Sequence, residues 1–297
     1  FAIDREAAVD LAADGLADVT GPIVPAQTEF VLPFSEFPSY SHNPQRAQEL
    51  LAEAGVTDLS LTLTVNSQNA AHVGIAPVIA EQLAAVGISV SIEMVETGVW
   101  IDRLTTFDYD LILGSSGGAP NPDIPFGNSF MCNGPWNYTG VCDESFDKLV
   151  REVWAASAED RVSGYQELQR KLVNEMMPVS HLFVGRMLWG WADEVKGYEP
   201  LPLIERRFET IFIEDAAVSA EAEESASGGS LTAGITTEPT SLDPVLETAL
   251  TSYLVLLPMY DRLVRFAPDL TYEPQVAESW SWSDDGLEIT FVLRQDV

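Results

Sequence analysis

A strand–helix–strand pattern in the first hundred residues constrains the fold most. Residues 59–65, LSLTLTV, alternate apolar and polar side chains as a half-buried strand does, and residues 88–95, ISVSIEMV, do the same. The residues between them, 70–86, follow a helical pattern that contains Pro77 and stops at Gly87. Two strands joined by one crossover helix pair in parallel, and the crossover is right-handed.

The same alternation of helical and strand patterns continues on both sides of this unit. The clearest further helix has Asn43 as its N-cap, Pro44 at its first position and Gly55 as its stop. The patterns of apolar residues predict further helices at residues 4–16, 99–105, 143–155 and 159–176. They also predict strands at 109–113 and 179–191. The sequence therefore predicts an α/β fold.

A loop rich in glycine and proline, GSSGGAPNPDIPFG at residues 114–127, follows the expected strand at 109–113. Loops that leave the carboxyl ends of parallel strands are where open α/β sheets bind ligands. The loop lacks the GxSxG pattern of a nucleophile elbow and the Gly-Lys-Ser/Thr ending of a phosphate-binding loop. It is therefore a candidate binding segment without a catalytic motif.

The clearest boundary lies at residues 216–230, AAVSAEAEESASGGS. This segment uses only five residue types and cannot bury a core, so we expect a flexible acidic linker. The part that follows should contain a strand at 231–235, packed in a sheet with strands from 179–213, and a helix over 249–266. The chain should end in a β-hairpin, 277–297, that turns at Asp-Asp-Gly.

The charge balance excludes two classes of partner. Fifteen basic and 46 acidic residues give a net charge of -31, which repels a phosphate backbone or an anionic membrane surface. The same charge would attract cationic ligands, although solubility alone accounts for it. No apolar run reaches the roughly 18 residues that suggest a membrane-spanning helix.

No group of residues forms a catalytic or metal-binding motif. His42, His72 and His181 are far apart in sequence and have no ligand spacing, so ordinary hydrogen-bonded histidines are expected. The acidic residues that could mimic a metal cluster match no calcium loop and are expected to be solvated: Asp102, Asp108, Asp110 and Asp123. We therefore predict that the protein is not an enzyme and holds neither a metal nor a cofactor.

The only cysteines, Cys132 and Cys142, flank nine residues in a loop rich in Gly, Asn and Pro. The spacing excludes a CxxC motif, and we expect a disulfide if the protein is exported; two separate buried thiols are the alternative. The loop contains Trp136, Asn137 and Tyr138. Aromatic faces beside an amide suit a ligand with apolar and polar ends, but Trp136 could equally anchor the loop to the body.

Many segments together resemble one family, the extracytoplasmic solute-binding proteins of peptide and nickel ABC importers (family 5). The first part matches it through FAIDREAAVD, NPQRAQELLAEAG, IAEQLAAVGISVSIEMV and FDYDLILG, and the last part through SLDP, YDRLVRF and PQVAESWSWSDDGLEITFVLRQDV. The resemblance implies an incomplete two-lobed periplasmic-binding-protein-like α/β fold (type II, cluster C), with mixed sheets flanked by helices. It also implies a monomer outside the cytoplasm, lipid-anchored in its full-length parent, that delivers its solute to a membrane permease.

The order of the segments departs from the family. Residues 1–178 resemble its C-terminal, large ligand-binding lobe, 179–215 the strands that return to the other lobe, and 231–297, beyond the 216–230 linker, its N-terminal region. A circular permutant with a deletion, the junction of two tandem copies, and an artefact of gene assembly all fit this order.

The resemblance also guides the ligand prediction. In dipeptide-binding relatives, the loop after the FDYD strand is similar to a segment rich in Trp and Asp, and an Asp there captures the peptide's amino group. Here the loop has Gly and Ser at those places, and only Asp123 matches a later Asp of the motif. A peptide or another polar solute is therefore expected.

The ligand should bind in a cleft where three segments converge. The predicted ligand-binding residues come from these segments: Ser115, Ser116, Asn121, Asp123, Trp136, Asn137, Tyr138, Thr236, Thr237 and Glu238. The alternatives are a hydrolase that uses the 114–127 loop, and a fragment that binds nothing.

Overall fold

The computed structural model forms two compact units, Phe1–Met187 and Leu188–Val297, which are considered one at a time. The boundary falls inside the segment 179–215 that the sequence assigns to returning strands. The acidic linker 216–230 lies outside the described residues. The structure describes residues 1–24, 29–115, 121–186, 188–201, 207–208, 210–213, 232–235, 238–239, 241–245, 250–267, 271–283 and 286–296.

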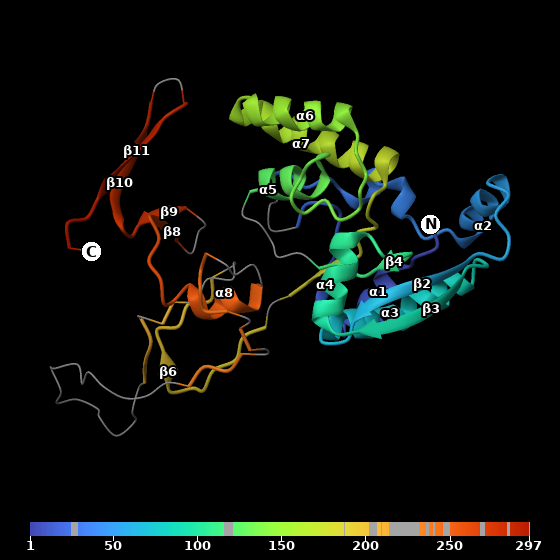
Figure 1. Ribbon diagram of the computed structural model, residues 1–297, viewed down its shortest axis with the longest axis horizontal. Coiled ribbons are helices and arrows are strands. Elements are labelled where there is room, and N and C mark those ends of the chain that lie inside the picture. The colour runs from blue at the N-terminus through green and yellow to red at the C-terminus, as the bar shows by residue number, and fades with distance from the viewer. Residues whose placement is uncertain are drawn as a thin grey trace. The chain divides into compact units, whose positions relative to one another are not determined.

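A parallel sheet forms one half of the first unit (Figure 1). It contains β2 (Ser60–Asn66), β3 (Ser89–Val95) and β4 (Leu111–Ile112) in the order β3-β2-β4. Both pairings are parallel, and β2 pairs with β3 along its whole length. The helix α3 (Ala70–Ala84) connects β2 to β3. The predicted strand–helix–strand unit is therefore confirmed.

The interior of this half explains why the helix continues through Pro77. Asn69 caps α3 by accepting hydrogen bonds from the backbone of Ala71 and His72. A proline inside a helix costs a backbone hydrogen bond. Burial of the apolar face offsets this cost, because one cluster joins helix and sheet residues: Ala8, Leu63, Val65, Ile75, Ala76, Ile79 and Leu113.

Three further helices and one strand pair surround the sheet. The helix α1 (Arg5–Ala12) packs against α3, where a side chain at Gly74 would meet the Ala12 backbone oxygen at 3.2 Å. The other elements are α2 (Pro44–Glu53), α4 (Thr97–Thr106) and β1 (Ala17–Val19), which pairs antiparallel with β5 (Phe183–Gly185). The 3₁₀ turns η1 (Phe34–Glu36) and η2 (Pro38–Tyr40) lie apart from the sheet, where Phe37 and Tyr40 are buried with Val173.

The other half of the first unit is helical. Its elements are α5 (Asp123–Pro125), the π-helical η3 (Phe126–Phe130), α6 (Glu144–Ala155), α7 (Ala158–Lys171) and the π-helical η4 (Leu172–Met176). Gly164 lets α6 and α7 approach closely, since an added Cβ there would lie 2.5 Å from a Val153 methyl. The predicted helices at 143–155 and 159–176 are confirmed.

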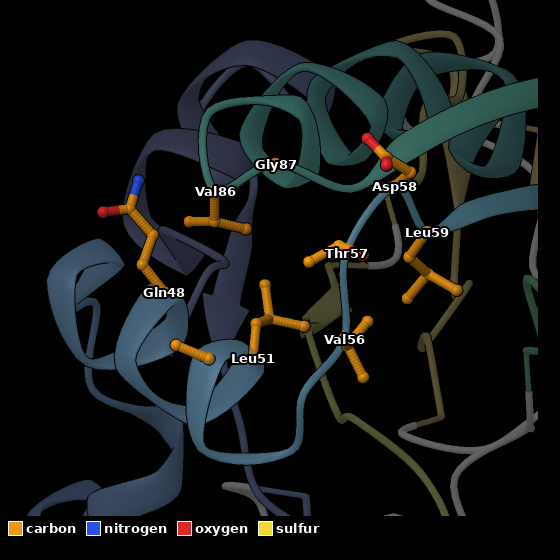
Figure 2. Close-up of a pocket in the computed structure, with 9 residues that line it drawn as sticks. Gln48, Leu51, Val56, Thr57, Asp58, Leu59, Val86 and Gly87 are labelled. Atoms are coloured by element: carbon orange, nitrogen blue, oxygen red, sulfur yellow. The ribbon is translucent and has the colours of Figure 1, made fainter.

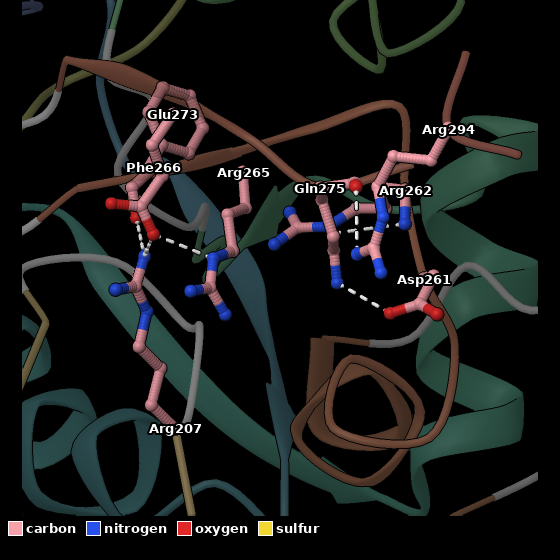
Figure 3. Close-up of polar contacts among 8 residues, drawn as sticks. All are labelled: Arg207, Asp261, Arg262, Arg265, Phe266, Glu273, Gln275 and Arg294. Carbon is pink, nitrogen blue, oxygen red and sulfur yellow. Dashed lines mark hydrogen bonds and ion pairs between the residues drawn. The ribbon is translucent and has the colours of Figure 1, made fainter. Parts of the chain in front are cut away.

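The second unit is built from short elements. They are β6 (Val195–Lys196) with β7 (Phe212–Ile213), α8 (Leu250–Leu256), β8 (Val264–Phe266) with β9 (Tyr272–Pro274), and β10 (Ala277–Trp282) with β11 (Ile289–Leu293), each pair antiparallel. Glu273 on β9 binds both Arg265 on β8, at 2.6 Å, and Arg207, at 2.8 Å (Figure 3). The antiparallel pairing predicted for the terminal hairpin is confirmed, and Asp284 and Asp285 of its expected turn lie outside the described residues.

Three expected elements are wrong. The helix expected over 249–266 ends at Leu256, because Pro258 disfavours helical backbone before it, and β8 follows. The strand expected over 179–191 shrinks to β5, which pairs with β1. The described residues 232–235 form no strand and are exposed, so the pairing expected for 231–235 is not seen there; Ala233 and Gly234 give this segment little to pack.

Among the described residues, no helix has the length and apolar character needed to span a bilayer.

Candidate functional site

The carboxyl ends of β2 and β4 lie at one edge of the parallel sheet, with β2 in the centre. From β2 the chain crosses through α3 to β3, and it then returns to the other side of β2 as β4. The direction of the connections therefore reverses between β2 and β4. Such a reversal leaves a crevice at the carboxyl ends of the strands, where open α/β sheets bind ligands.

Three side chains from the two strand ends meet in this crevice. The hydroxyl oxygen of Ser115, after β4, lies 2.7 Å from Nε2 of His72. Nδ2 of Asn69, after β2, donates to the same oxygen at 3.5 Å. Because Asn69 also caps α3, its amide is held in place by the backbone. The first turn of α3 and the end of β4 are thus joined by side-chain hydrogen bonds.

A second group of polar side chains continues the crevice toward α4. The Thr97 hydroxyl lies 3.1 Å from Oδ1 of Asn66 and 2.6 Å from Oε1 of Gln68. The Gln68 backbone N–H also donates to Oδ1 of Asn66, at 3.0 Å. We call the six residues of both groups the edge cluster: Asn66, Gln68, Asn69, His72, Thr97 and Ser115.

The imidazole of His72 is almost completely buried, with 4% of the residue exposed. Burial lowers the pKa of His72, so the ring is neutral near pH 7. Its Nδ1 is buried without a hydrogen-bond partner. The ring centroid lies 5.8 Å from that of Trp100, whose indole N–H donates to the Leu113 carbonyl at 3.0 Å. Trp100 therefore joins α4 to His72 and to the end of β4.

Asn121 and Asp123, further along the loop after β4, bind each other. Nδ2 of Asn121 donates to Oδ2 of Asp123 at 3.0 Å, and its Oδ1 accepts from the Asp123 backbone at 2.9 Å. The same Asp123 oxygen forms an ion pair with Arg161 on α7, which also donates to the Tyr165 hydroxyl at 3.3 Å. The other carboxylate oxygen of Asp123 is buried without a hydrogen-bond partner.

The loop between α5 and α6 is closed by a disulfide between Cys132 and Cys142, with Cα atoms 4.4 Å apart. Inside it, the Asn137 amide donates to the carbonyls of Met131 and Val141 at 2.9 and 2.8 Å. Its oxygen accepts from Thr139 at 2.9 Å. The amide of Asn137 therefore holds the loop in shape.

Trp136 and Tyr138 lie in the same loop. Trp136 is 48% exposed, and the Tyr138 carbonyl accepts a hydrogen bond from the hydroxyl of Tyr109. Tyr109 precedes β4, whereas Ser115 follows it. The contact therefore ties the loop to the start of β4.

An apolar hollow lies at the opposite edge of the sheet, where β2 and β3 begin (Figure 2). Its volume is about 240 Å³, and it is lined by Gln48, Leu51, Ala52, Val56, Thr57, Asp58, Leu59, Val86 and Gly87. Its walls are mainly apolar, so it offers a polar solute few hydrogen bonds.

The structure brings only part of the predicted site into the edge cluster. Ser115 belongs to it. Glu238 is exposed and belongs to the second unit. Ser116, Thr236 and Thr237 lie outside the described residues. The convergence of the three segments stays a prediction.

Sequence reasoning missed the edge-cluster residues that follow β2 and β3, and also Trp100. The signal in the sequence is that Asn66, Gln68 and Thr97 follow the expected strands at 59–65 and 88–95, whose carboxyl ends lie at the same edge as that of β4. Across the described residues there is no group of three or more His, Cys, Asp or Glu that could hold a metal ion.

The parallel sheet has polar side chains at its carboxyl edge, which is where open α/β sheets bind ligands. Residues 1–138 match the sequence profile of the bacterial extracellular solute-binding proteins, family 5 middle region. This part of the chain is therefore similar to the family that the sequence resembles. Members of this family are binding proteins rather than enzymes, and they act outside the cytoplasm.

Curated relatives agree with this assignment. The chain is 26% identical over 227 residues to "Probable di/tripeptide-binding protein 5" of Pseudomonas aeruginosa (strain UCBPP-PA14). The aligned region covers 72% of this chain and 41% of the relative. The chain is 31% identical over 181 residues to "Di/tripeptide-binding protein 2" of the same strain, covering 58% and 34%. The chain thus spans less than half the length of these relatives.

Solved structures agree on the fold. The oligopeptide-binding protein AppA from Bacillus subtilis, in complex with a nonapeptide, matches with a TM-score of 0.56 and 25% identity over 67% of this chain and 43% of that one. The dipeptide-binding protein from Pseudoalteromonas sp. SM9913, in complex with Met-Leu, matches with a TM-score of 0.62 and 20% identity over 71% and 43%. The predicted incomplete, two-lobed periplasmic-binding type of α/β fold is confirmed.

Proposed function

We propose that this chain is part of the substrate-binding component of an ABC importer. It captures a small solute, a peptide or another polar solute, and presents it to a membrane permease outside the cytoplasm. The observation that carries the proposal is the edge cluster at the switch point between β2 and β4. Its hydroxyl, amide and imidazole groups offer the few convergent polar contacts that fix a ligand's orientation.

The remaining wall of the site belongs to the same proposal. The proposal includes closure of the ligand between two lobes, with residues 231–297 taking the place of the family's N-terminal region. Thr236, Thr237 and Glu238, together with Ser116 and the Trp136–Tyr138 loop, are the proposed further contacts. The relatives named as di/tripeptide-binding proteins support a solute of that size.

Binding takes place without chemistry. The Ser115–His72 pair has the spacing of a nucleophile and its base, which is the one feature that favours a hydrolase. A serine–histidine pair works when a third group orients the second ring nitrogen. Nδ1 of His72 is buried and has no such partner. A peptide bound at the edge cluster is therefore released intact.

Isothermal titration of the chain with di- and tripeptides tests the proposal, with mass spectrometry of the recovered peptides. We expect saturable binding and uncleaved peptide. Ser115→Ala should weaken binding by about 1 kcal/mol, the typical contribution of one hydrogen bond. The matched control is Ser163→Ala on the exposed side of α7, which should bind normally. Absence of saturable binding, or equal loss in both variants, would contradict the assignment.

A further inference from the structure

We propose that the crevice between β2 and β4 accepts an uncharged solute group rich in hydroxyls or amides, and disfavours the charged ends of a free peptide. This inference rests on the proposed function and specifies its substrate class. It is carried by the charge of the groups that surround the crevice.

Two of the segments that border the crevice contain almost no ionisable side chains. Residues 111–115, LILGS, have none, and residues 66–75, NSQNAAHVGI, have only His72. The His72 ring is buried, and burial lowers its pKa, so it stays neutral near pH 7. The carboxylate at the end of β3, Glu96, is exposed and lies on the outer strand, beyond β2. In a chain of net charge -31, a neutral crevice is a specific local feature.

The one carboxylate on the loop after β4 is already compensated. Asp123 forms an ion pair with Arg161 and accepts a hydrogen bond from Asn121. Both charged side chains are mostly buried, with 28% of Arg161 and 26% of Asp123 exposed. A ligand ammonium group would have to compete with this intramolecular cation for the carboxylate. Arg161 therefore reduces the attraction of Asp123 for a cationic ligand.

The edge cluster is suited to neutral groups. A charged group that leaves water and forms hydrogen bonds only to neutral groups loses more solvation free energy than those hydrogen bonds return. A hydroxyl or amide group replaces its hydrogen bonds to water with equivalent hydrogen bonds to the protein. No contact within the described part of the chain uses the side-chain N–H groups of Asn66 or Gln68. One Thr97 hydroxyl proton cannot serve both amide oxygens. The cluster therefore offers both donors and acceptors, but no counter-charge.

A matched pair of probes tests this inference: the dipeptide Ala-Leu and its capped form, N-acetyl-Ala-Leu-amide. The two share side chains and differ in terminal charge. In isothermal titration, the dissociation constant of the capped form should be lower by a factor of about ten or more. This factor corresponds to one charged group of the free dipeptide that finds no counter-charge in the site. Tighter binding of free Ala-Leu would overturn the inference and leave the proposed function standing. If neither probe, nor any peptide of the titration above, binds, the proposed function itself fails.

Arg161→Gln tests the part played by the ion pair. Removal of the guanidinium leaves Asp123 uncompensated, so the preference for the capped probe should fall about tenfold. Arg151→Gln, on the exposed side of α6, is the control and should keep the wild-type ratio. A thermal melt of each variant separates loss of folding from loss of selectivity. An unchanged ratio in folded Arg161→Gln would overturn the role of Arg161.

Discussion

Acidification should destabilise the first unit through His181. Its ring nitrogen Nδ1 lies 2.8 Å from the hydroxyl of Tyr40, and Arg5 donates to its carbonyl at 2.7 Å. The Phe130 ring lies 6.2 Å away. Loss of solvation, with a smaller contribution from the positive charge of Arg5, lowers the pKa of His181 from 6.5 to about 4. Protonation of the ring therefore favours the unfolded chain.

The pH window follows from these two pKa values. Between pH 6.5 and about 4 the unfolded chain binds the proton and the folded chain does not. The contribution of His181 to stability is therefore complete above pH 6.5 and is lost as the pH falls toward 4. The difference between the two pKa values corresponds to at most about 3 kcal/mol in the free energy of unfolding, because one pKa unit corresponds to about 1.4 kcal/mol. The figure is an upper bound because His181 retains some solvent access.

Urea unfolding followed by tryptophan fluorescence, at about pH 7.5 and about pH 4.5, measures this loss. His181→Gln, which cannot titrate, should reduce the difference between the two free energies of unfolding by about 2–3 kcal/mol. His42→Gln is the control, because His42 is exposed. His72 is also buried with a lowered pKa, so the free energy of unfolding of every variant, including His181→Gln, should retain some pH dependence. If His181→Gln kept the full wild-type pH dependence, the reasoning would be refuted.

Two further predictions concern the loop between α5 and α6. Replacing both Cys132 and Cys142 by Ser should lower the free energy of unfolding by roughly 2–3 kcal/mol, which denaturant titration measures, and unreduced, denatured protein should contain no free thiol. Free thiols, or an unaffected midpoint in the double variant, would contradict this. Trp136→Ala should weaken solute binding by roughly 1–4 kcal/mol if the half-exposed indole is an anchor for the ligand. Unchanged affinity would restrict Trp136 to the support of the loop.

The sequence predicted best the elements that have strong periodicity and clear caps. The strands β2 and β3 alternate in hydrophobicity over seven residues, and Asn69 and Asn43 cap the helices that were expected near them. The pairing of β1 with β5 could not be predicted in this way, because it joins segments more than 160 residues apart and each strand has three residues. Such short strands carry too little periodicity to specify a partner.

The candidate site shows the same division. Ser115 was predicted because its loop follows an expected strand. His72 was assigned an ordinary role because a lone histidine has no ligand spacing, and only the fold brings it within 2.7 Å of Ser115. The compensation of Asp123 by Arg161 depends on a contact across 38 residues, so composition gave no sign of it. Chemistry that depends on contacts between distant segments appears once the strand order is known.

Hydrogen–deuterium exchange of the ligand-saturated chain tests the central claim, that a polar solute binds at the carboxyl edge of the parallel sheet. Backbone amides in residues 66–72, 96–100 and 113–115 should become protected when the solute is added. The opposite edge, residues 51–59 around the apolar hollow, should exchange as before. Protection at 51–59 with no change in the other three segments would contradict the account.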